Sequence, residues 1–249
     1  MYLIGDIGNT DIKICLFNNN YKLIKNIRIK TNLLNKRYLS KNLKFIKNYK
    51  FNIKKVLFSS VVPLAYNKIK KFIDQSINAT CIELKQLKLK NLLKIKVNKK
   101  QIGSDRLANA ISVIDKTKNY IIVDFGTATN FDVVIKDNYI GGILAPGVNL
   151  SLNTLSDKAS LIPKIKLEKI NSIIGKNTTS AIRAGFYHGY SGLIDNIIKM
   201  IIKQTGRSFN IILTGGYSYL FKNTIKRKAI IKKDLTIYGL LKVLINLNK

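Results

Sequence analysis

A strand–turn–strand pattern occurs twice in the chain, and this repetition constrains the fold more than any other feature. The N-terminal segment MYLIGDIG is an apolar strand that ends in a carboxylate and a glycine, and NYIIVDFG at residues 119–126 repeats it. In each copy a short turn follows, and then two further segments with the alternation typical of strands. Asp6 and Asp124 occupy equivalent positions in the two copies. The pattern predicts an internal duplication, with each half opening on a three-stranded unit.

Helices and strands alternate along the rest of the chain, and such alternation is typical of the α/β class. Because DKTKN at residues 115–119 interrupts the pattern, we expect two domains, residues 1–117 and 118–249. Each domain is expected to hold a mixed sheet flanked by helices. The predicted strands include residues 54–62 and 209–216, and the predicted helices include residues 64–77, 103–117, 177–206 and 234–248.

Each repeated hairpin has the chemistry of a phosphate-binding loop. In the first hairpin Gly8 permits a sharp turn that exposes backbone N–H groups, and Lys13 adds positive charge. A single hairpin of this kind is more often an ordinary β-turn. The second copy, with Asp124 and Thr127, favours phosphate binding. Two such hairpins that face one another across a cleft can hold a polyphosphate and its cation.

The sequence lacks the motifs of two other classes of nucleotide-dependent protein. No segment matches GxxxxGK[ST], so the chain has no Walker A loop. Residues 124–126 spell the DFG of protein kinases, but the Gly-rich loop, the lysine and the HRD loop that should precede it are missing. The sequence therefore excludes a P-loop NTPase and a protein kinase.

The ordered set of motifs resembles the type III pantothenate kinases, a family to which the name Bvg accessory factor also attaches. The resemblance implies the fold of the actin/Hsp70/sugar-kinase superfamily, with two duplicated ribonuclease H-like (actin-like ATPase) domains. It also implies ATP-dependent phosphorylation of pantothenate to 4′-phosphopantothenate, the first step of coenzyme A biosynthesis. The motifs that carry it run in the family's order: DIGNTDIK, SSVVP, GSDR, DFGTAT, GGILAPG, SLNTLSDKASLIPKI, GKNT and DLTIYGL.

The site residues are implied by this resemblance. Asp105 resembles the catalytic base that acts on the pantothenate hydroxyl. Asp124 resembles the family's ligand for a monovalent cation, K⁺ or NH₄⁺, and Thr127 resembles an ATP contact. The resemblance places the phosphates of ATP, with Mg²⁺, on Asp6, Ile7, Gly8, Asn9, Thr10, Asp11, Ile12 and Lys13. It places the substrate on Gly103, Ser104, Asp105, Arg106 and Thr178, with Thr178 near the interface of a homodimer.

The local reading of GSDR is compatible with these roles. We expect Ser104 to be the N-cap of a helix, which places Asp105 in the first turn, where the helix dipole favours an anion. From these residues alone, a carboxylate that only complements the dipole is the more frequent case. The role of Asp105 as proton acceptor comes from the resemblance.

Three positions depart from the family's pattern. Lys96 stands where the family usually has a tyrosine, Lys99 where it has a proline, and Asn130 where it commonly has a threonine. The two lysines lie in the segment before GSDR and bear on the affinity for pantothenate. Because Asp105 and both phosphate hairpins are intact, we expect an active enzyme.

The charge of the chain points to a different class of protein. Lysine and arginine number 44 against 13 aspartates and glutamates, for a net charge of +31, which on its own indicates nucleic acid or an anionic membrane surface. The lysines are dispersed among isoleucine and asparagine, as AT-rich coding would produce, and no nucleic-acid-reading motif accompanies them. We expect only weak, sequence-independent binding to nucleic acid. A non-catalytic regulatory or nucleic-acid-binding protein of the same fold remains the competing hypothesis.

The remaining reactive residue types indicate packing rather than chemistry. Cys15 and Cys81 lie in alternating strand patterns and are interpreted as small buried hydrophobic residues. His188 is interpreted as a packing or surface residue. No apolar run is long enough to span a membrane and no signal peptide is recognisable, so we expect a cytoplasmic protein. The aromatic residues expected to pack a helix interface are Phe186, Tyr187 and Tyr190.

Overall fold

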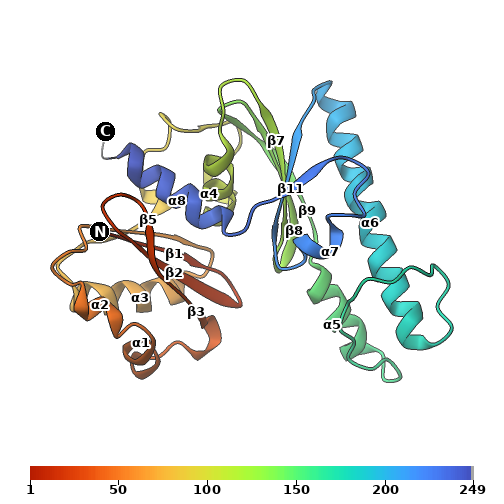
Figure 1. Ribbon diagram of the computed structural model, residues 1–249, viewed down its shortest axis with the longest axis horizontal. Helices are drawn as coiled ribbons and strands as arrows, with labels where there is room; N and C mark the ends of the chain where they lie inside the picture. Colours follow the sequence, from red (N-terminus) through yellow and green to blue (C-terminus); the bar gives the residue numbers. More distant parts are fainter. Residues whose placement is uncertain (248–249) are drawn as a thin grey trace. The chain divides into compact units, whose positions relative to one another are not determined.

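The computed structural model describes residues 1–247 and separates them into two compact units (Figure 1). The first unit consists of residues 1–114 and the segment that begins at Leu235, and the second consists of residues 115–234. Residues 248 and 249, which end the predicted second domain, lie outside the described residues.

The first unit is built on a five-stranded mixed sheet with the strand order β3-β2-β1-β4-β5. The first three strands form an antiparallel meander, whereas β4 runs parallel to β1, and β5 runs parallel to β4. The central strands are buried along most of their length, which agrees with their apolar sequences. The strands are β1 (Tyr2–Ile7), β2 (Asp11–Phe17), β3 (Leu23–Lys30), β4 (Lys55–Ser60) and β5 (Cys81–Glu83).

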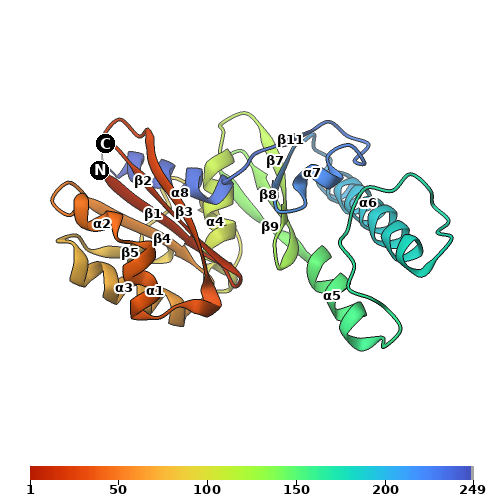
Figure 2. The same ribbon diagram turned by 60° about the horizontal axis from the view of Figure 1, so that its bottom comes forward.

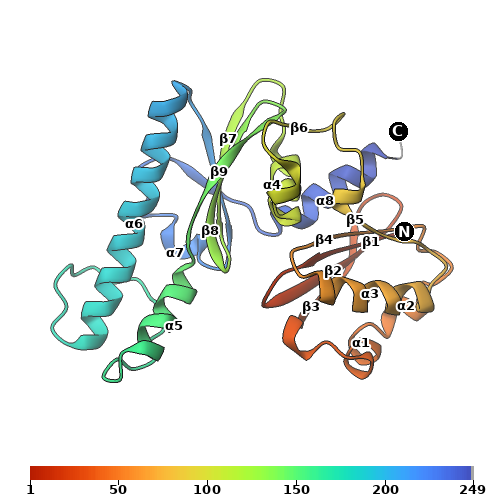
Figure 3. The same cartoon turned by 180° about the vertical axis from the view of Figure 1, so that it is seen from behind.

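Helices cover both faces of this sheet (Figures 2 and 3). The helices α1 (Lys36–Asn42), α2 (Phe45–Asn48) and α3 (Pro63–Ser76) share one buried core with the sheet. The helix α8 (Leu235–Asn246) contacts the strands β1 and β4, and α4 (Ser104–Val113) contacts β4. The short elements of this unit are η1 (Thr31–Leu33), η2 (Leu84–Gln86), β6 (Lys94–Ile95) and η3 (Lys99–Gln101).

The C-terminal helix α8 departs from the expected division of the chain. We expected residues 118–249 to form one domain, but α8 groups with the first unit. The reason is a close helix crossing, in which a Cβ atom on Gly239 would lie 1.9 Å from the carbonyl oxygen of Ala108 on α4. The Thr236 hydroxyl also donates a 2.9 Å hydrogen bond to Asn109 Oδ1. The chain therefore returns to its first unit after the second unit ends.

The second unit repeats the sheet of the first, which confirms the predicted duplication. Its strands follow the order β11-β10-β7-β8-β9. Here β7, β8 and β9 form an antiparallel meander, β10 is parallel to β7, and β11 is parallel to β10. Each strand thus has a counterpart in the first unit, in the same order and sense. The strands are β7 (Asn119–Phe125), β8 (Ala128–Ile135), β9 (Asn138–Pro146), β10 (Asn210–Gly215) and β11 (Ala229–Ile231).

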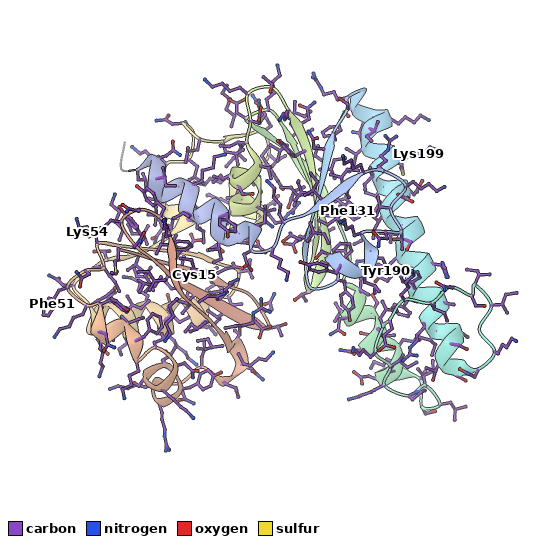
Figure 4. All side chains as sticks on the ribbon, in the orientation of Figure 1. Cys15, Phe51, Lys54, Phe131, Tyr190 and Lys199 are labelled. Carbon is purple, nitrogen blue, oxygen red and sulfur yellow. The ribbon has the colours of Figure 1, made fainter. Side chains whose placement is uncertain are left out.

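The long helix α6 (Thr178–Thr205) packs on one face of the second sheet. Figure 4 labels Tyr190 on this helix and Phe131 on β8, which belong to the same core. The predicted aromatic packing is confirmed, because the Tyr187 ring stacks on Phe221 at a centroid distance of 6.1 Å. The unit also contains α5 (Val148–Lys158) and α7 (Ser218–Phe221).

Both cysteines are buried free thiols, as the sequence predicts, and Figure 4 places Cys15 within the first sheet. His188 contacts the Tyr187 ring edge-on at 5.2 Å, in agreement with a packing role. Among the described residues, none of the helices combines the length and hydropathy that a membrane span requires.

Candidate active site

The first repeated hairpin is a tight turn between β1 and β2. The Gly8 amide donates to the carbonyl of Asp11 at 3.0 Å, and a Cβ atom on Gly8 would lie 3.1 Å from that carbonyl oxygen. The tip residues Asn9 and Thr10 are exposed to solvent. Lys30 forms a 2.8 Å ion pair with Asp11, which ties the base of the turn to β3. The tip therefore has the access that a ligand needs, while its base is fixed.

Asp6, at the end of β1, lies in a row of polar side chains that crosses the sheet. Lys13 on β2 and Ser59 on β4 are its direct neighbours in the strand register. The Ser59 hydroxyl donates a short hydrogen bond to Asp6 Oδ1. Burial, and to a smaller extent the negative charge of Asp105, raise the pKa of Asp6 to about 7, against the opposing effects of Ser59 and Lys13.

Asp105 lies in the first turn of α4, as predicted, but the cap of this helix is not the predicted one. Gly103 is the N-cap residue, and Ser104 is the first helical residue. Ser104 is fully buried, and its hydroxyl donates a short hydrogen bond to Glu83 Oε1 rather than capping the helix. A carboxylate accepts a stronger hydrogen bond than a neutral group does, so the hydroxyl turns to Glu83.

The carboxylate of Asp105 lies directly over the backbone of Gly103. A Cβ atom on Gly103 would be only 2.4 Å from Asp105 Oδ1, so any larger residue would displace this oxygen. The same oxygen accepts a 2.8 Å hydrogen bond from the Arg106 amide. Burial raises the pKa of Asp105, and the amide and charge of Arg106 oppose that effect. The first unit therefore brings Asp6 and Asp105 into electrostatic contact.

The segment before Gly103 is held by lysine side chains. Lys99 Nζ donates to the carbonyls of Lys85 and Leu87 at 3.1 and 3.2 Å. In return, Lys85 Nζ donates to the carbonyls of Lys100 and Ile102 at 3.1 and 3.0 Å. Lys99 thus has a structural role at the position where the resembled family has proline, whereas Lys96 is exposed. We call these four hydrogen bonds the lysine clasp.

In the second unit, Asp124 ends β7 as Asp6 ends β1. Its register neighbours are Asn130 on β8 and Thr214 on β10, the counterparts of Lys13 and Ser59. Asn130 Oδ1 is buried and has no hydrogen-bond donor. A carboxylate and an amide oxygen on one sheet face are hard ligands of the kind that an alkali cation takes. The two sites thus differ in chemistry. The neighbours of Asp6 include the ammonium group of Lys13, whereas those of Asp124 include the amide oxygen of Asn130.

The turn after Asp124 is closed by glycines from other segments. A Cβ atom on Gly147 would lie 2.0 Å from the carbonyl oxygen of Thr127. Gly215 has a φ of +84°, and a Cβ atom there would lie 2.7 Å from Asp124 Oδ1. The GGILAPG motif and the segment around Gly215 therefore pack against the DFGTAT turn. Thr178, by contrast, is an exposed residue at the start of α6, after the N-cap Asn177.

Two residues of the first unit were not singled out from the sequence. Ser59 belongs to the SSVVP motif, and its position in β4 parallel to β1 was the available signal. No local sequence pattern indicates a role for Glu83, because its hydrogen-bond partner Ser104 is distant in the chain. Only the packing of η2, which directly follows Glu83, against α4 reveals it.

Comparison with known proteins points to one family. A family model described as type III pantothenate kinase matches residues 2–200. The type III pantothenate kinase of Pelagibacter ubique (strain HTCC1062) is 56% identical over 242 residues, which cover 97% of this chain and 98% of that protein. The type III pantothenate kinase of Sulfurihydrogenibium sp. (strain YO3AOP1) is 36% identical over 251 residues, covering 96% and 98%.

The fold also resembles that of solved kinase structures. A candidate 2-dehydro-3-deoxygalactonokinase from Sinorhizobium meliloti superposes with a TM-score of 0.66 and 9% identity. The alignment covers 99% of each chain. At this identity the likeness concerns the fold alone, the duplicated α/β architecture of the actin-like and sugar-kinase proteins.

Proposed function

The chain belongs to the type III pantothenate kinase family, and we propose that Asp105 is the residue that accepts the proton of the pantothenate hydroxyl. As a member of this family, the protein is a kinase that uses ATP to phosphorylate pantothenate in coenzyme A biosynthesis. The single observation that best supports the role of Asp105 is its half-buried carboxylate, held over Gly103 and acting electrostatically on Asp6.

The proposed reaction is an in-line phosphoryl transfer. Asp105 orients the hydroxyl and takes its proton, while the hydroxyl oxygen forms a bond to the γ-phosphorus of ATP. The bond between that phosphorus and the β,γ-bridging oxygen breaks, and ADP leaves with the bond's electron pair. Phosphoryl transfer depends mainly on positioning and charge stabilisation. The raised pKa of Asp105 also makes it a better proton acceptor than an exposed carboxylate.

The first hairpin fits the phosphates of Mg-ATP. Mg²⁺ usually takes one or two protein carboxylates and completes its shell with water and phosphate oxygens. Asp6 is such a carboxylate, and no cluster of three acidic, histidine or cysteine side chains competes with it among the described residues. In our proposal Asp6 holds Mg²⁺, and the segment from Ile7 to Lys13 binds the phosphates through its amides and the Lys13 ammonium.

The second hairpin fits a monovalent cation. Potassium and ammonium favour several neutral or singly charged oxygen ligands, and Asn130 Oδ1 is a buried oxygen without a donor beside Asp124 in the strand register. We assign the cation to Asp124, with Asn130 as a further oxygen ligand, and an ATP contact to Thr127.

Dimerisation is the third part of the proposal, and it rests on an exposed apolar surface of the second unit. Leu161 is 91% exposed, and Ile174 is 77% exposed, both in the segment between α5 and α6. On α6 itself, Gly189 has no atom within 4 Å of a Cβ position. We propose that a second copy of this chain covers this surface, close to Thr178. Sedimentation at micromolar concentration, with a monomer as the contrary result, tests it.

We further place the enzyme in the cytoplasm, where ATP is supplied. The two free thiols agree with a reducing compartment. A fractionation experiment that recovers the protein with the membrane or periplasmic fraction would contradict this location.

The deciding experiment for the proposed function is a coupled assay of ADP release from Mg-ATP, with and without pantothenate. We expect release only when pantothenate is present, and an equimolar phosphorylated product. Asp105→Asn is the matched variant, because it keeps the shape of the side chain while removing the proton acceptor. Pantothenate-dependent turnover at the wild-type rate in this variant would overturn the assignment of Asp105.

A further inference from the structure

Glu83 forms three hydrogen bonds within the first unit, although it lies outside the motifs that the sequence singles out. It ends β5, where its Oε1 accepts the hydrogen bond from the Ser104 hydroxyl. Its Oε2 accepts from the Lys85 amide at 2.7 Å. Its own amide donates to Gln86 Oε1 at 3.0 Å, which completes a capping box. Both carboxylate oxygens are thus engaged, one by η2 and the other by α4.

The donor of the hydrogen bond to Glu83 is fully buried. Ser104 has 0% of its surface exposed, and it is the first residue of α4. A hydrogen bond to a carboxylate is stronger than one between neutral groups, and a buried donor that loses its acceptor is costly. The first turn of α4 is therefore anchored to β5 through one side-chain pair.

The lysine clasp reinforces the same junction. It joins η2, which directly follows Glu83, to η3, which directly precedes the Gly103 turn. Both ends of the connection between Glu83 and Ser104 are therefore fixed. Further along α4, the hydrogen bond from Thr236 holds Asn109. The anchor at Glu83 acts at the end of the helix that carries Asp105.

Asp105 depends on this anchor for its position. The hydrogen bond that its carboxylate accepts comes from the Arg106 amide in its own helix. The same oxygen lies close to the backbone of Gly103, where an added Cβ atom would be 2.4 Å away from it. Since both partners belong to the same turn, the carboxylate moves wherever the turn moves.

From these contacts we propose that Glu83 is a positioning residue of the kinase, which holds Asp105 against the substrate hydroxyl through Ser104 and the first turn of α4. This inference rests on the role of Asp105 given above. Glu83 itself touches neither substrate nor nucleotide in the proposal. Its effect on the reaction is to keep the proton acceptor within hydrogen-bonding reach, where a displacement of about 1 Å can cost roughly 10²-fold in rate.

The test uses Glu83→Gln and Ser104→Ala, with Ser112→Ala as the matched control. In Glu83→Gln the Ser104 hydroxyl faces a neutral amide in place of a carboxylate, so its charge-assisted hydrogen bond is replaced by a weaker neutral one. Ser112 also lies on α4, and its hydroxyl donates to the Asn109 carbonyl at 2.6 Å, remote from the first turn. Turnover, the KM for ATP and the melting temperature are measured for each variant in the full-length protein.

We expect kcat to fall about 10²-fold in Glu83→Gln, with a KM for ATP that changes less than about twofold because Asp6 is intact. The Glu83→Gln/Ser104→Ala double variant is expected to lose less than the sum of the two single variants, because both act through one contact. Ser112→Ala keeps the wild-type kcat. If Ser112→Ala lowered kcat as much as Glu83→Gln does, the loss would be due to general destabilisation of the protein, and the inference would be overturned.

Amide hydrogen exchange of residues 105–107 provides a readout that needs no activity. Faster exchange in Glu83→Gln, confined to the first turn of α4, is the expected result. Unchanged exchange together with a normal kcat would refute the positioning role while leaving the proposed function intact. If instead the wild-type protein released no ADP in response to pantothenate, the proposed function would fail. In that case unchanged exchange in Glu83→Gln would on its own refute the anchoring of α4 by Glu83.

Discussion

The carboxylate of Asp105, on α4, acts electrostatically on that of Asp6, on β1, within the first unit. Burial, and to a smaller extent this repulsion, raise the pKa of Asp6 to about 7. One carboxylate is proposed to hold Mg²⁺ and the other to accept a proton. Their roles are therefore coupled, because a cation bound at Asp6 relieves the repulsion between them.

The pH dependence of nucleotide binding is the first prediction. Because its pKa is raised, Asp6 keeps a proton in the folded protein between about pH 4 and pH 7, whereas it loses this proton in the unfolded chain. The stability that the bound proton contributes is therefore lost as the pH rises through that window. Mg²⁺ requires the ionised form, so Mg-ATP affinity should rise about tenfold from pH 6 to pH 8. Calorimetry in buffers of different ionisation enthalpy measures the released proton. Asp6→Asn should remove both effects, and a flat wild-type profile would contradict the assignment.

Asp105→Asn separates chemistry from binding. The substitution keeps the size of the side chain and removes the proton acceptor, so turnover should fall by roughly 10²–10⁴, the usual contribution of a positioned acid or base. Nucleotide affinity should not fall, since the Asp6 hairpin is unchanged and the repulsion of Asp6 is removed. Steady-state kinetics and equilibrium nucleotide binding on the same preparation check both outcomes. Near-normal turnover would leave Asp105 as a residue that only complements the helix dipole.

Gly103→Ala is predicted to displace the carboxylate of Asp105 without unfolding the protein. The φ of Gly103 is −59°, which alanine adopts freely, but the new Cβ would meet Asp105 Oδ1 at 2.4 Å. A carboxylate at the end of a side chain can rotate away, so the stability should change little. Turnover should fall by about 10- to 100-fold. In an Asp105→Asn background the same substitution should have no further effect, and an additional loss there would place its cause elsewhere.

Potassium should raise turnover above the level seen in sodium at equal ionic strength. Asp124→Asn should abolish the difference, and Asn130→Ala should weaken the apparent potassium affinity about tenfold, the low end of the usual effect of a supporting ligand. A potassium-dependent rise in melting temperature without substrate gives a measure of binding itself. Equal rates and equal melting temperatures in the two salts would contradict a cation site at Asp124.

Gly239→Ala probes the crossing of α8 and α4. Its Cβ would lie 1.9 Å from the backbone oxygen of Ala108, which cannot rotate away, so the two helices must separate. We expect a loss of about 1–3 kcal/mol in the free energy of unfolding, the usual cost of overpacking. Tyr238→Ala, at a position that is 57% exposed on the same helix, is the control and should change stability by less than about 0.5 kcal/mol. Urea unfolding with matched slopes compares the two.

The sequence by itself determined the architecture of each half and the position of its hairpins. The alternation of apolar residues in MYLIGDIG and NYIIVDFG, followed by a glycine turn, is a local pattern with a fixed period. The same is true of the helices around Ile69 and Ile194, whose spacing marks a buried face. Local periodicity reflects which side of an element is buried, so it can be recognised before the fold is known.

The tertiary structure determined the contacts between distant segments, which local sequence patterns do not encode. The hydrogen bond between Glu83 and Ser104, the lysine clasp and the crossing of Gly239 over Ala108 join segments that are separate in the chain. Ser104 had the sequence signature of an N-cap, but a carboxylate from β5 offered a stronger acceptor. Such contacts depend on how strands and helices pack. The periodicity of one segment does not indicate which other segment it will contact. For that reason Asp105 could be placed in the first turn of its helix from the sequence, whereas Glu83, its proposed positioning residue, could not be identified.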